Sequence, residues 1–281
     1  MEEHTLRPND ITRFETHLHQ EEYALGTAEK YLRDVRHLTA WLNGRTISKT
    51  IVVQWKDHLL SDGYAPVTVN SMLASVNCFF KMMDWHDCRV KELRIQRRLF
   101  RDQEKELTRE EYARLLEVAN ASGKERLALL METICSTGIR VSEVQYITVE
   151  ALQVGRAEVA LKGKIRTILI PNKLCRKLQK YAKKQKIVSG EIFLTRSGKG
   201  LSRRQIWAEM KALCKQAGVA ASKVFPHNLR HLFARAFYKA CHDVSRLADV
   251  LGHSSIETTR IYLISTGAEH ARQMERLGLI S

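Results

Sequence analysis

Apolar residues recur every three or four positions through residues 1–86 and predict four amphipathic helices. The predicted helices begin at residues that can cap or open a helix, namely Asn9 or Asp10, Thr27, Ser48 and Pro66. On the second helix, for example, Leu32, Val35 and Leu38 fall on one face. Four such faces can form a common core, so we expect a small helical domain over residues 1–86.

Residues 87–106 interrupt this pattern with few apolar residues and a high density of positive charge. The basic residues of the segment include Arg94, Arg97 and Arg98. We interpret it as an interdomain linker whose charges would contact a DNA backbone. His86-Asp87-Cys88 contains residue types that bind metals, but a second cluster of ligands does not accompany it, so the sequence predicts no metal there.

Helical periodicity returns at Thr108, which can form a capping box with Glu111, and it continues through most of residues 107–281. Between Leu152 and Pro171 the apolar period shortens to about two, and glycines separate the runs. This alternation predicts three short antiparallel strands joined by tight turns. The expected fold is therefore mainly α, with a helical first domain and a mostly helical second domain that carries a small three-stranded antiparallel sheet.

The composition of the chain indicates the kind of partner it binds. The chain has 281 residues, a net charge of +15 and a pI near 9.7, which favours a polyanion such as nucleic acid. Its six cysteines are scattered without a C-x-x-C pair, which is typical of reduced thiols in a cytoplasm. A signal-peptide pattern and an apolar run of membrane-spanning length are both missing from the sequence. We therefore expect a cytoplasmic protein with no membrane partner.

Four side chains in the last quarter of the chain could act together, namely His227, Arg230, His253 and Tyr262. His227 and Arg230 stand three residues apart after a proline, so they project from one face of a helix. An arginine clamps two phosphate oxygens, an imidazole donates or moves a proton, and a tyrosine can form a covalent intermediate. Together these groups suit a phosphodiester, although each alone is more typical of a surface pair or of core packing.

Arg140 is a further candidate because it follows Gly138, where one helix ends and a new element begins. Glu143 stands three residues later and could orient Arg140 by a salt link. An arginine at such a point is a common functional side chain, but alone it is equally an ordinary helix-end residue.

Through these residues the chain resembles the tyrosine recombinases, the phage integrase and Xer-like group of site-specific DNA recombinases, over nearly its whole length. The motifs that carry the resemblance are Thr137-Gly138-Ile139-Arg140-Val141-Ser142-Glu143, His227-Asn228-Leu229-Arg230-His231, Leu251-Gly252-His253-Ser254 and Thr258-Thr259-x-x-Tyr262. The predicted turn Leu161-Lys162-Gly163-Lys164-Ile165-Arg166 departs from the family's Gly-Lys-Gly pattern. The family's hairpin lysine falls best on Lys162, with Lys164 as its competitor.

The resemblance implies a SAM-like core-binding domain over residues 1–86 and a catalytic domain over residues 107–281. It implies that Tyr262 attacks a scissile phosphate and forms a 3′-phosphotyrosyl bond. The roles it implies for the other residues are phosphate binding for Arg140 and Arg230, donation to a non-bridging oxygen for His253, acid–base catalysis or orientation for His227, protonation of the leaving oxygen for Lys162, and support for Glu143.

The resemblance also implies partners. Two domains would enclose double-stranded DNA at inverted-repeat core sites, four protomers would assemble on it, and accessory DNA-bending proteins could take part, in the cytoplasm of a bacterium. The residues expected at the DNA are Lys30, Arg33, Lys81, Arg94, Arg97, Arg98 and Lys164. A C-terminal helix with Ala268, Ala271, Met274 and Leu277 would dock on a neighbouring protomer, or pack on its own domain.

No cofactor and no metal are expected, because exchanging a phosphodiester for a phosphotyrosine requires no nucleotide hydrolysis. Two alternatives stay open. One is a catalytically silent DNA-binding protein on the same fold, which would have no use for the tyrosine. The other is a topoisomerase-like enzyme that relaxes supercoiled DNA without a specific site.

Overall fold

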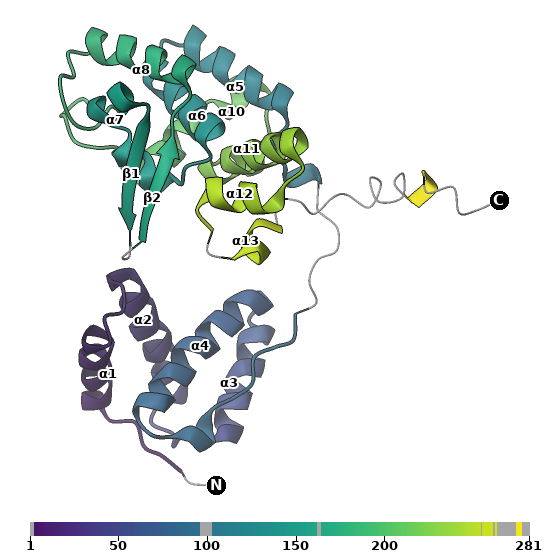
Figure 1. The fold of residues 1–281 in the computed structure, drawn as a ribbon. Helices are drawn as coiled ribbons and strands as arrows, with labels where there is room; N and C mark the ends of the chain where they lie inside the picture. The colour runs from purple at the N-terminus through teal and green to yellow at the C-terminus, as the bar shows by residue number, and fades with distance from the viewer. Residues whose placement is uncertain are drawn as a thin grey trace. The chain divides into compact units, whose positions relative to one another are not determined.

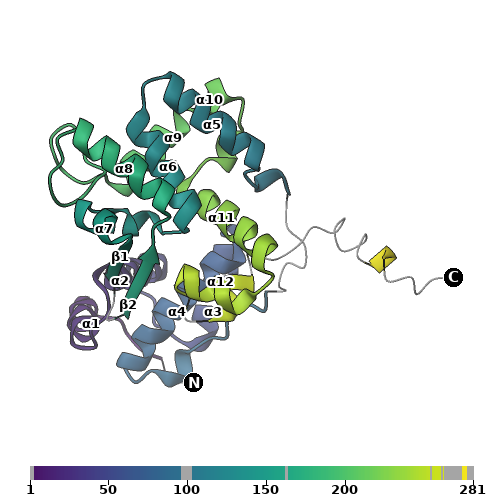
Figure 2. The same ribbon diagram turned by 45° about the horizontal axis from the view of Figure 1, so that its top comes forward.

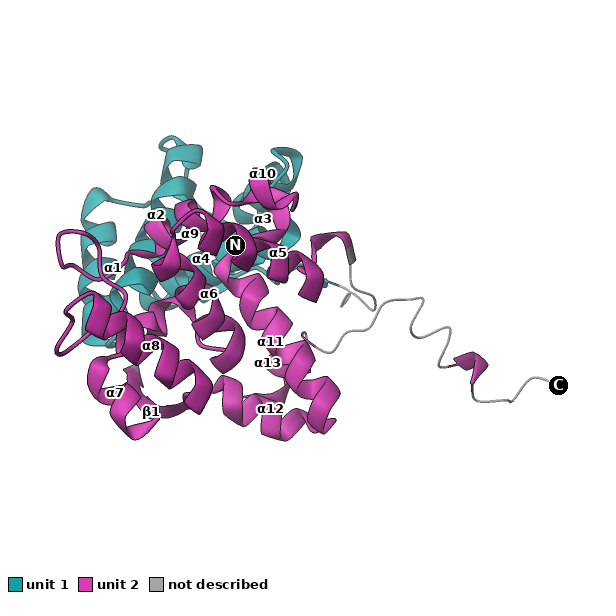
Figure 3. Cartoon of the chain, turned by 90° about the horizontal axis from the view of Figure 1, so that it is seen from above, with its two compact units in different colours: residues 1–97 teal, residues 98–281 magenta. Residues whose placement is uncertain are grey.

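The computed structural model of the chain describes residues 3–95, 103–161, 164–253, 255–260, 262 and 274–276 (Figure 1). The chain divides into two compact units, residues 1–97 and residues 98–281, each with an apolar core of its own (Figure 3). Within the described residues, no helix combines the length and the apolar character needed to cross a membrane.

The first unit contains the four expected helices, which are α1 (Pro8–Gln20), α2 (Leu25–Leu42), α3 (Lys49–Ser61) and α4 (Pro66–Met82), and then the short helix η1 (His86–Cys88) (Figure 1). A proline opens α1 and α4, where its missing N–H leaves no bond unmade. The apolar faces of the helices meet in a core whose largest fully buried side chains include Trp55, Phe14, Phe79 and Phe80.

Two asparagine side chains fasten the segment after η1 to helix α4. Asn77 Nδ2 donates to the carbonyl of Val90 at 2.9 Å, and Asn77 Oδ1 accepts from the Val90 amide at 3.1 Å. Asn70 makes the same pair of bonds to Leu93, at 2.9 and 2.8 Å. Each asparagine thus binds both the N–H and the C=O of one residue. These bonds hold the segment after η1 against α4.

Helix α6 (Glu125–Thr137) is the most buried helix of the second unit, and its residues Leu130, Met131 and Ile134 have no exposed surface. The helices that contact it are α5 (Arg109–Ala121), α8 (Asn172–Lys184), α9 (Arg203–Lys211) and α11 (Pro226–Cys241) (Figure 2). The expected capping box opens α5, because Thr108 Oγ1 accepts from the Glu111 amide and Glu111 Oε2 accepts from the Thr108 amide.

Shorter helices complete the second unit. They are η2 (Gln103–Lys105), η3 (Val141–Tyr146), α7 (Val149–Val154), α10 (Cys214–Ala217), η4 (Ala221–Lys223), α12 (Val244–Leu251) and α13 (Ile256–Arg260). Helix α12 contacts both α11 and α13, so the segments that carry the motifs of Arg230, His253 and Tyr262 lie together at one side of the unit (Figure 1).

The prediction of three antiparallel strands is corrected to two within the described residues. Strand β1 (Arg156–Leu161) pairs with β2 (Lys164–Leu169), with Arg156 opposite Leu169. The stretch expected to form the first strand is instead the end of α7. Thr148 caps that helix through its side chain, and Gly155 ends it at a φ of +71°, so local cap chemistry decided against a strand.

Candidate active site

Arg140 is placed by the end of α6 and the start of η3. Gly138 ends α6 at a φ of +66°, and a side chain there would collide with the ring of Phe233. The salt link expected between Arg140 and Glu143 is present, with Arg140 Nη1 2.8 Å from Glu143 Oε1. The Arg140 side chain is 41% exposed and that of Glu143 only 1%, so a buried carboxylate holds an accessible guanidinium.

Glu143 binds a second arginine, Arg166 on β2, for which the sequence predicted no role. Arg166 Nη1 lies 3.1 Å from both Glu143 oxygens, and Arg166 Nη2 donates to the carbonyl of Val250 at 2.9 Å. Burial lowers the pKa of Arg166 to about 10; the charges of Arg230 and Arg140 also lower it, and Glu143 opposes them. The one sequence signal for Arg166 was its place just after the hairpin lysines.

Arg230 lies near the start of α11 and is 2% exposed. Its Nη1 donates to the carbonyl of Gly138 at 2.6 Å, and its Nη2 donates to that of Leu251 at 2.8 Å. Burial and the charge of Arg140 lower the pKa of Arg230, while its hydrogen bond with Tyr262 acts in the opposite direction. These bonds fix the guanidinium beside the tyrosine hydroxyl.

His253 follows α12 and is bonded at both ring nitrogens. Its Nε2 lies 2.9 Å from Arg230 Nη2, and its Nδ1 lies 2.8 Å from Thr259 Oγ1. Burial lowers the pKa of His253 to about 4, and the charges of neighbouring arginines add to the shift. The imidazole is therefore neutral near pH 7 in the absence of DNA.

Tyr262 is 3% exposed, and its ring lies among imidazoles. The Tyr262 ring stacks on that of His253, with centroids 5.7 Å apart and planes at 12°. The ring of His231 is nearer, at 4.4 Å, and that of His227 lies at 6.1 Å. In the sequence, His231 is only the last residue of a motif, and its contact with Tyr262 depends on a fold that the motif does not show.

The structure thus gathers Arg140, Glu143, Arg230, His253 and Tyr262 in one place, with His227 exposed beside the tyrosine. Their catalytic roles stay predictions. Lys162 lies outside the described residues, and of Lys164 only the backbone, at the start of β2, is described. The lysine that serves as the hairpin lysine is therefore also a prediction.

The residues expected at the DNA differ in their surroundings. Lys30 Nζ is bonded to Asp34 Oδ2 at 2.6 Å, to Ser75 Oγ at 2.9 Å and to the carbonyl of Ser71 at 2.9 Å, so all three of its N–H donors are used within the first unit. The exposed members of the set are Arg33, Lys81 and Arg94, whereas Arg97 and Arg98 lie outside the described residues. In the C-terminal segment, Met274 is 70% exposed, and Ala268, Ala271 and Leu277 lie outside the described residues.

His4, Asp87 and Cys88 come together in the first unit, with one potential metal-ligand atom of each within 4.8 Å of the others. His4 was not foreseen, because its backbone pairing with Ile47 and its stacking on Trp85 are contacts between distant segments. His4 Nε2 lies 3.0 Å from Asp87 Oδ1, and burial raises the pKa of Cys88 to about 11, which opposes the thiolate that a metal needs. A hydrogen bond between His4 and Asp87 accounts for this contact, and the expected absence of a metal stays a prediction.

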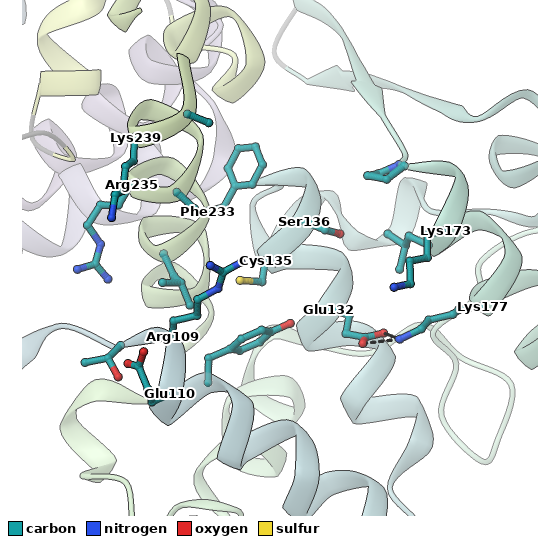
Figure 4. Close-up of a pocket in the computed structure, with 17 residues that line it drawn as sticks. Arg109, Glu110, Glu132, Cys135, Ser136, Lys173, Lys177, Phe233, Arg235 and Lys239 are labelled. Carbon is teal, nitrogen blue, oxygen red and sulfur yellow. Dashed lines mark hydrogen bonds and ion pairs between the residues drawn. The ribbon is translucent and has the colours of Figure 1, made fainter. Parts of the chain in front are cut away.

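A pocket of 1220 Å³ lies elsewhere in the second unit, between α5, α6, α8 and α11 (Figure 4). Lys177 and Glu132 form an ion pair across part of it, with Lys177 Nζ 2.6 Å from Glu132 Oε1. None of the candidate catalytic residues lines this pocket. Its size therefore says nothing about the phosphodiester chemistry, which belongs to the cluster around Arg230.

Comparison with known sequences places both units in one family. Residues 105–269 match the phage integrase family, and residues 11–86 match the phage integrase N-terminal SAM-like domain. Tyrosine recombinase XerA of Thermococcus kodakarensis is 30% identical over 279 residues, with 95% of each chain covered. XerA of Pyrococcus furiosus is 28% identical over 290 residues, with 100% of this chain and 98% of the relative covered. These two relatives are archaeal, so they give no support to the expected bacterial source.

Solved structures show the same fold. A lambda integrase dimer bound to a COC′ core site matches with a TM-score of 0.74 at 18% identity, covering 92% of this chain and 95% of that chain. The crystal structure of XerA recombinase matches with a TM-score of 0.53 at 22% identity, covering 97% and 99%. From the matched domains and the full-length relative at 30% identity, we conclude that the chain belongs to the phage integrase family, the tyrosine recombinases.

Proposed function

We propose that this protein is a site-specific DNA recombinase that breaks and rejoins strands through a 3′-phosphotyrosyl bond to Tyr262. The observation that carries the proposal is the cluster around Arg230. One buried guanidinium is hydrogen-bonded to the phenol of Tyr262 and to the imidazole of His253, while Arg140 stands beside it on the carboxylate of Glu143. A silent DNA-binding protein would have no need for this arrangement.

The cluster suits a phosphodiester because it offers cationic donors where negative charge develops. Arg140 and Arg230 would bind the non-bridging oxygens of the scissile phosphate and stabilise its pentacoordinate transition state. Fixed donors of this kind are worth about 3 kcal/mol each in a transition state. The carbonyls that now bind Arg230 hold its guanidinium in place before DNA arrives, which lowers the reorganisation needed.

Attack by the phenol oxygen forms the phosphotyrosine and releases the 5′-oxygen of the DNA. The phenol must lose its proton, and His227 is a candidate to accept it as a general base. Lys162 would protonate the leaving oxygen. The new bond conserves the phosphodiester, so a 5′-hydroxyl can reverse the reaction and reseal the strand with no nucleotide or other cofactor.

We propose that the substrate is double-stranded DNA with inverted-repeat core sites and that four protomers assemble on it. The net charge of +15 supports a polyanionic partner. Among the structural neighbours is a lambda integrase tetramer bound to a Holliday junction, with a TM-score of 0.74. The contacts expected from this chain are made by its exposed basic residues, and accessory DNA-bending proteins belong to the same proposal.

A plasmid assay separates this function from its alternatives. Supercoiled plasmids that carry two copies of a candidate site are incubated with the protein, and their products are resolved on gels. Recombinant circles that require both sites are the predicted result. Relaxation of a plasmid without a site would indicate a topoisomerase-like enzyme, and tight binding without any change of topology would indicate a silent binder.

A further inference from the structure

The two nitrogens of His253 have different partners, and these partners fix its tautomer. Arg230 Nη2 lies 2.9 Å from His253 Nε2, and a guanidinium has only N–H donors, so Nε2 must accept. The proton of the neutral ring is then on Nδ1, which donates to Thr259 Oγ1 at 2.8 Å.

Thr259 is well placed to hold this tautomer. It lies in α13 and has no exposed surface, so water does not compete for its hydroxyl. Its carbonyl accepts from the amide of Tyr262 at 3.0 Å. One buried residue therefore contacts the ring of His253 through its side chain and the backbone of Tyr262 through its carbonyl.

We propose that Thr259 is a positioning residue for DNA cleavage, whose hydroxyl binds Nδ1–H of His253 and thereby directs Nε2 to the scissile phosphate. The inference rests on the proposed function. When the phosphate takes the place of Arg230 at Nε2, that nitrogen takes one proton from a hydronium ion of the solvent, which leaves as water, and donates it in a hydrogen bond to a non-bridging oxygen. Nδ1–H stays on Thr259 throughout, and no other bond forms or breaks in this step.

The charges around His253 agree with a proton taken up only with the phosphate. Burial, followed by the charges of Arg230, Arg140 and Arg166 and by His227 on α11, holds the pKa of His253 at about 4 in the absence of DNA. A bound phosphate supplies the negative charge that reverses this shift. The Thr259 hydroxyl oxygen then stabilises the imidazolium of His253 by accepting a hydrogen bond from its Nδ1–H.

The first test reads the tautomer directly and needs no DNA. The full-length protein is labelled with ¹⁵N-histidine, and two-bond ¹H–¹⁵N correlations are recorded, with His253→Gln used for assignment. The expected result is a protonated Nδ1 and an unprotonated Nε2 in the wild type. In Thr259→Val, Arg230 still donates to Nε2, so the tautomer is kept, but the Nδ1–H has lost its acceptor and its proton resonance should move upfield. A wild type protonated on Nε2, or an unchanged Nδ1–H resonance in Thr259→Val, would overturn the proposal.

The second test measures single-turnover formation of the covalent adduct on a nicked duplex that carries the site mapped with the wild type. Thr259→Val is expected to slow adduct formation about 10- to 100-fold. The alkaline limb of its pH–rate profile, where the rate falls as His253 loses its proton, should move to lower pH, because the imidazolium has lost the Thr259 oxygen that stabilises it. Thr259→Ser keeps the hydroxyl and should restore most of the rate, and Thr258→Val is the matched control on an exposed neighbour.

If Thr259→Val merely disturbed the structure, it would lower the rate whether or not His253 is present. Thr259→Val is therefore also introduced into the His253→Ala variant. There Thr259→Val should cause no further loss, because its effect acts through the imidazole. An undiminished loss in that background would contradict the proposal. Failure of the wild type to form any adduct would instead sink the proposed function, and the tautomer measurement would still decide the contact.

Discussion

Arg166 and Glu143 form an ion pair that joins strand β2 to η3, with Arg166 Nη1 3.1 Å from both carboxylate oxygens. The Glu143 side chain is 1% exposed and also holds Arg140. Because one buried carboxylate binds both cations, the position of Arg140 depends on the strand that follows the hairpin lysines. The network therefore connects two parts of the proposed phosphate site that are more than 20 residues apart in the chain.

Replacing Arg166 by alanine should destabilise the second unit, because it leaves Glu143 buried with one cation fewer. Breaking a buried pair in this way costs about 3 kcal/mol. Urea unfolding of the two proteins measures the difference. Arg176→Ala on the exposed face of α8 is the control and should stay within about 0.5 kcal/mol of the wild type. Equal effects from the two substitutions would remove the basis for the network.

Gly252→Ala should be more damaging than Gly155→Ala, although both glycines end helices at positive φ. An alanine at Gly155, at +71°, meets no neighbouring atom, so it adds only backbone strain of about 1 kcal/mol. An alanine at Gly252, at +64°, would also collide with the side chain of Arg166 and disturb the bond to Glu143. Unfolding free energies and adduct rates of the pair provide the comparison, and similar values for both variants would speak against the close approach of Arg166.

The stability of the second unit should fall between about pH 6.5 and pH 4, in part because of His253. A free histidine has a pKa of about 6.5, whereas the folded environment lowers the pKa of His253 to about 4. In this window the unfolded chain binds a proton that the folded chain does not, so stability is lost as the pH falls. His253→Gln should flatten this dependence, as measured by urea midpoints from pH 4 to pH 7. Parallel curves for the two proteins would contradict the lowered pKa.

DNA affinity should fall steeply with salt, with a slope of about −0.9 per neutralised phosphate. Lys81→Ala and Arg94→Ala remove exposed charges, and each should make the slope shallower by about 1. Lys30→Ala should instead lower the stability of the first unit, because the ammonium is bonded to Asp34 and Ser75. Titrations at several salt concentrations test this, and a slope near zero in the wild type would refute binding of the DNA backbone.

The sequence predicted the features that depend on local pattern. The four helices of the first unit and the capping box at Thr108 were foreseen because periodicity and cap chemistry are local. The expected caps of the first two helices were wrong, because α1 begins at Pro8, before Asn9 and Asp10, and α2 begins at Leu25, before Thr27. The strand expected near residues 152–154 was wrong, because a short apolar run fits both a strand and a helix, and the Thr148 cap decided for the helix. Cap signals at both ends of such a run would have given the correct assignment.

Contacts between segments that are distant in the chain could not be predicted from the sequence. Lys30 looked like a phosphate ligand, yet its bonds to Ser71 and Ser75 follow from the packing of α2 against α4, about 40 residues away. The contact of Arg166 with Glu143 likewise depends on the packing of β2 against η3. The contact of His231 with Tyr262 depends on the position of Tyr262 against α11. The motifs pointed to the candidate site and to the support that Glu143 gives Arg140, but not to the contacts of Arg166 and His231.

Covalent trapping tests the central claim most directly. Wild type and Tyr262→Phe are incubated without metal or nucleotide with labelled duplex DNA from both flanks of the gene and nicked at intervals, and the products are separated in SDS. A protein–DNA adduct in the wild type, absent in Tyr262→Phe and attached at a 3′-phosphate, is the predicted result. An adduct that persists in Tyr262→Phe, or intact DNA after specific binding of the wild type, would contradict the assignment of Tyr262 as the nucleophile.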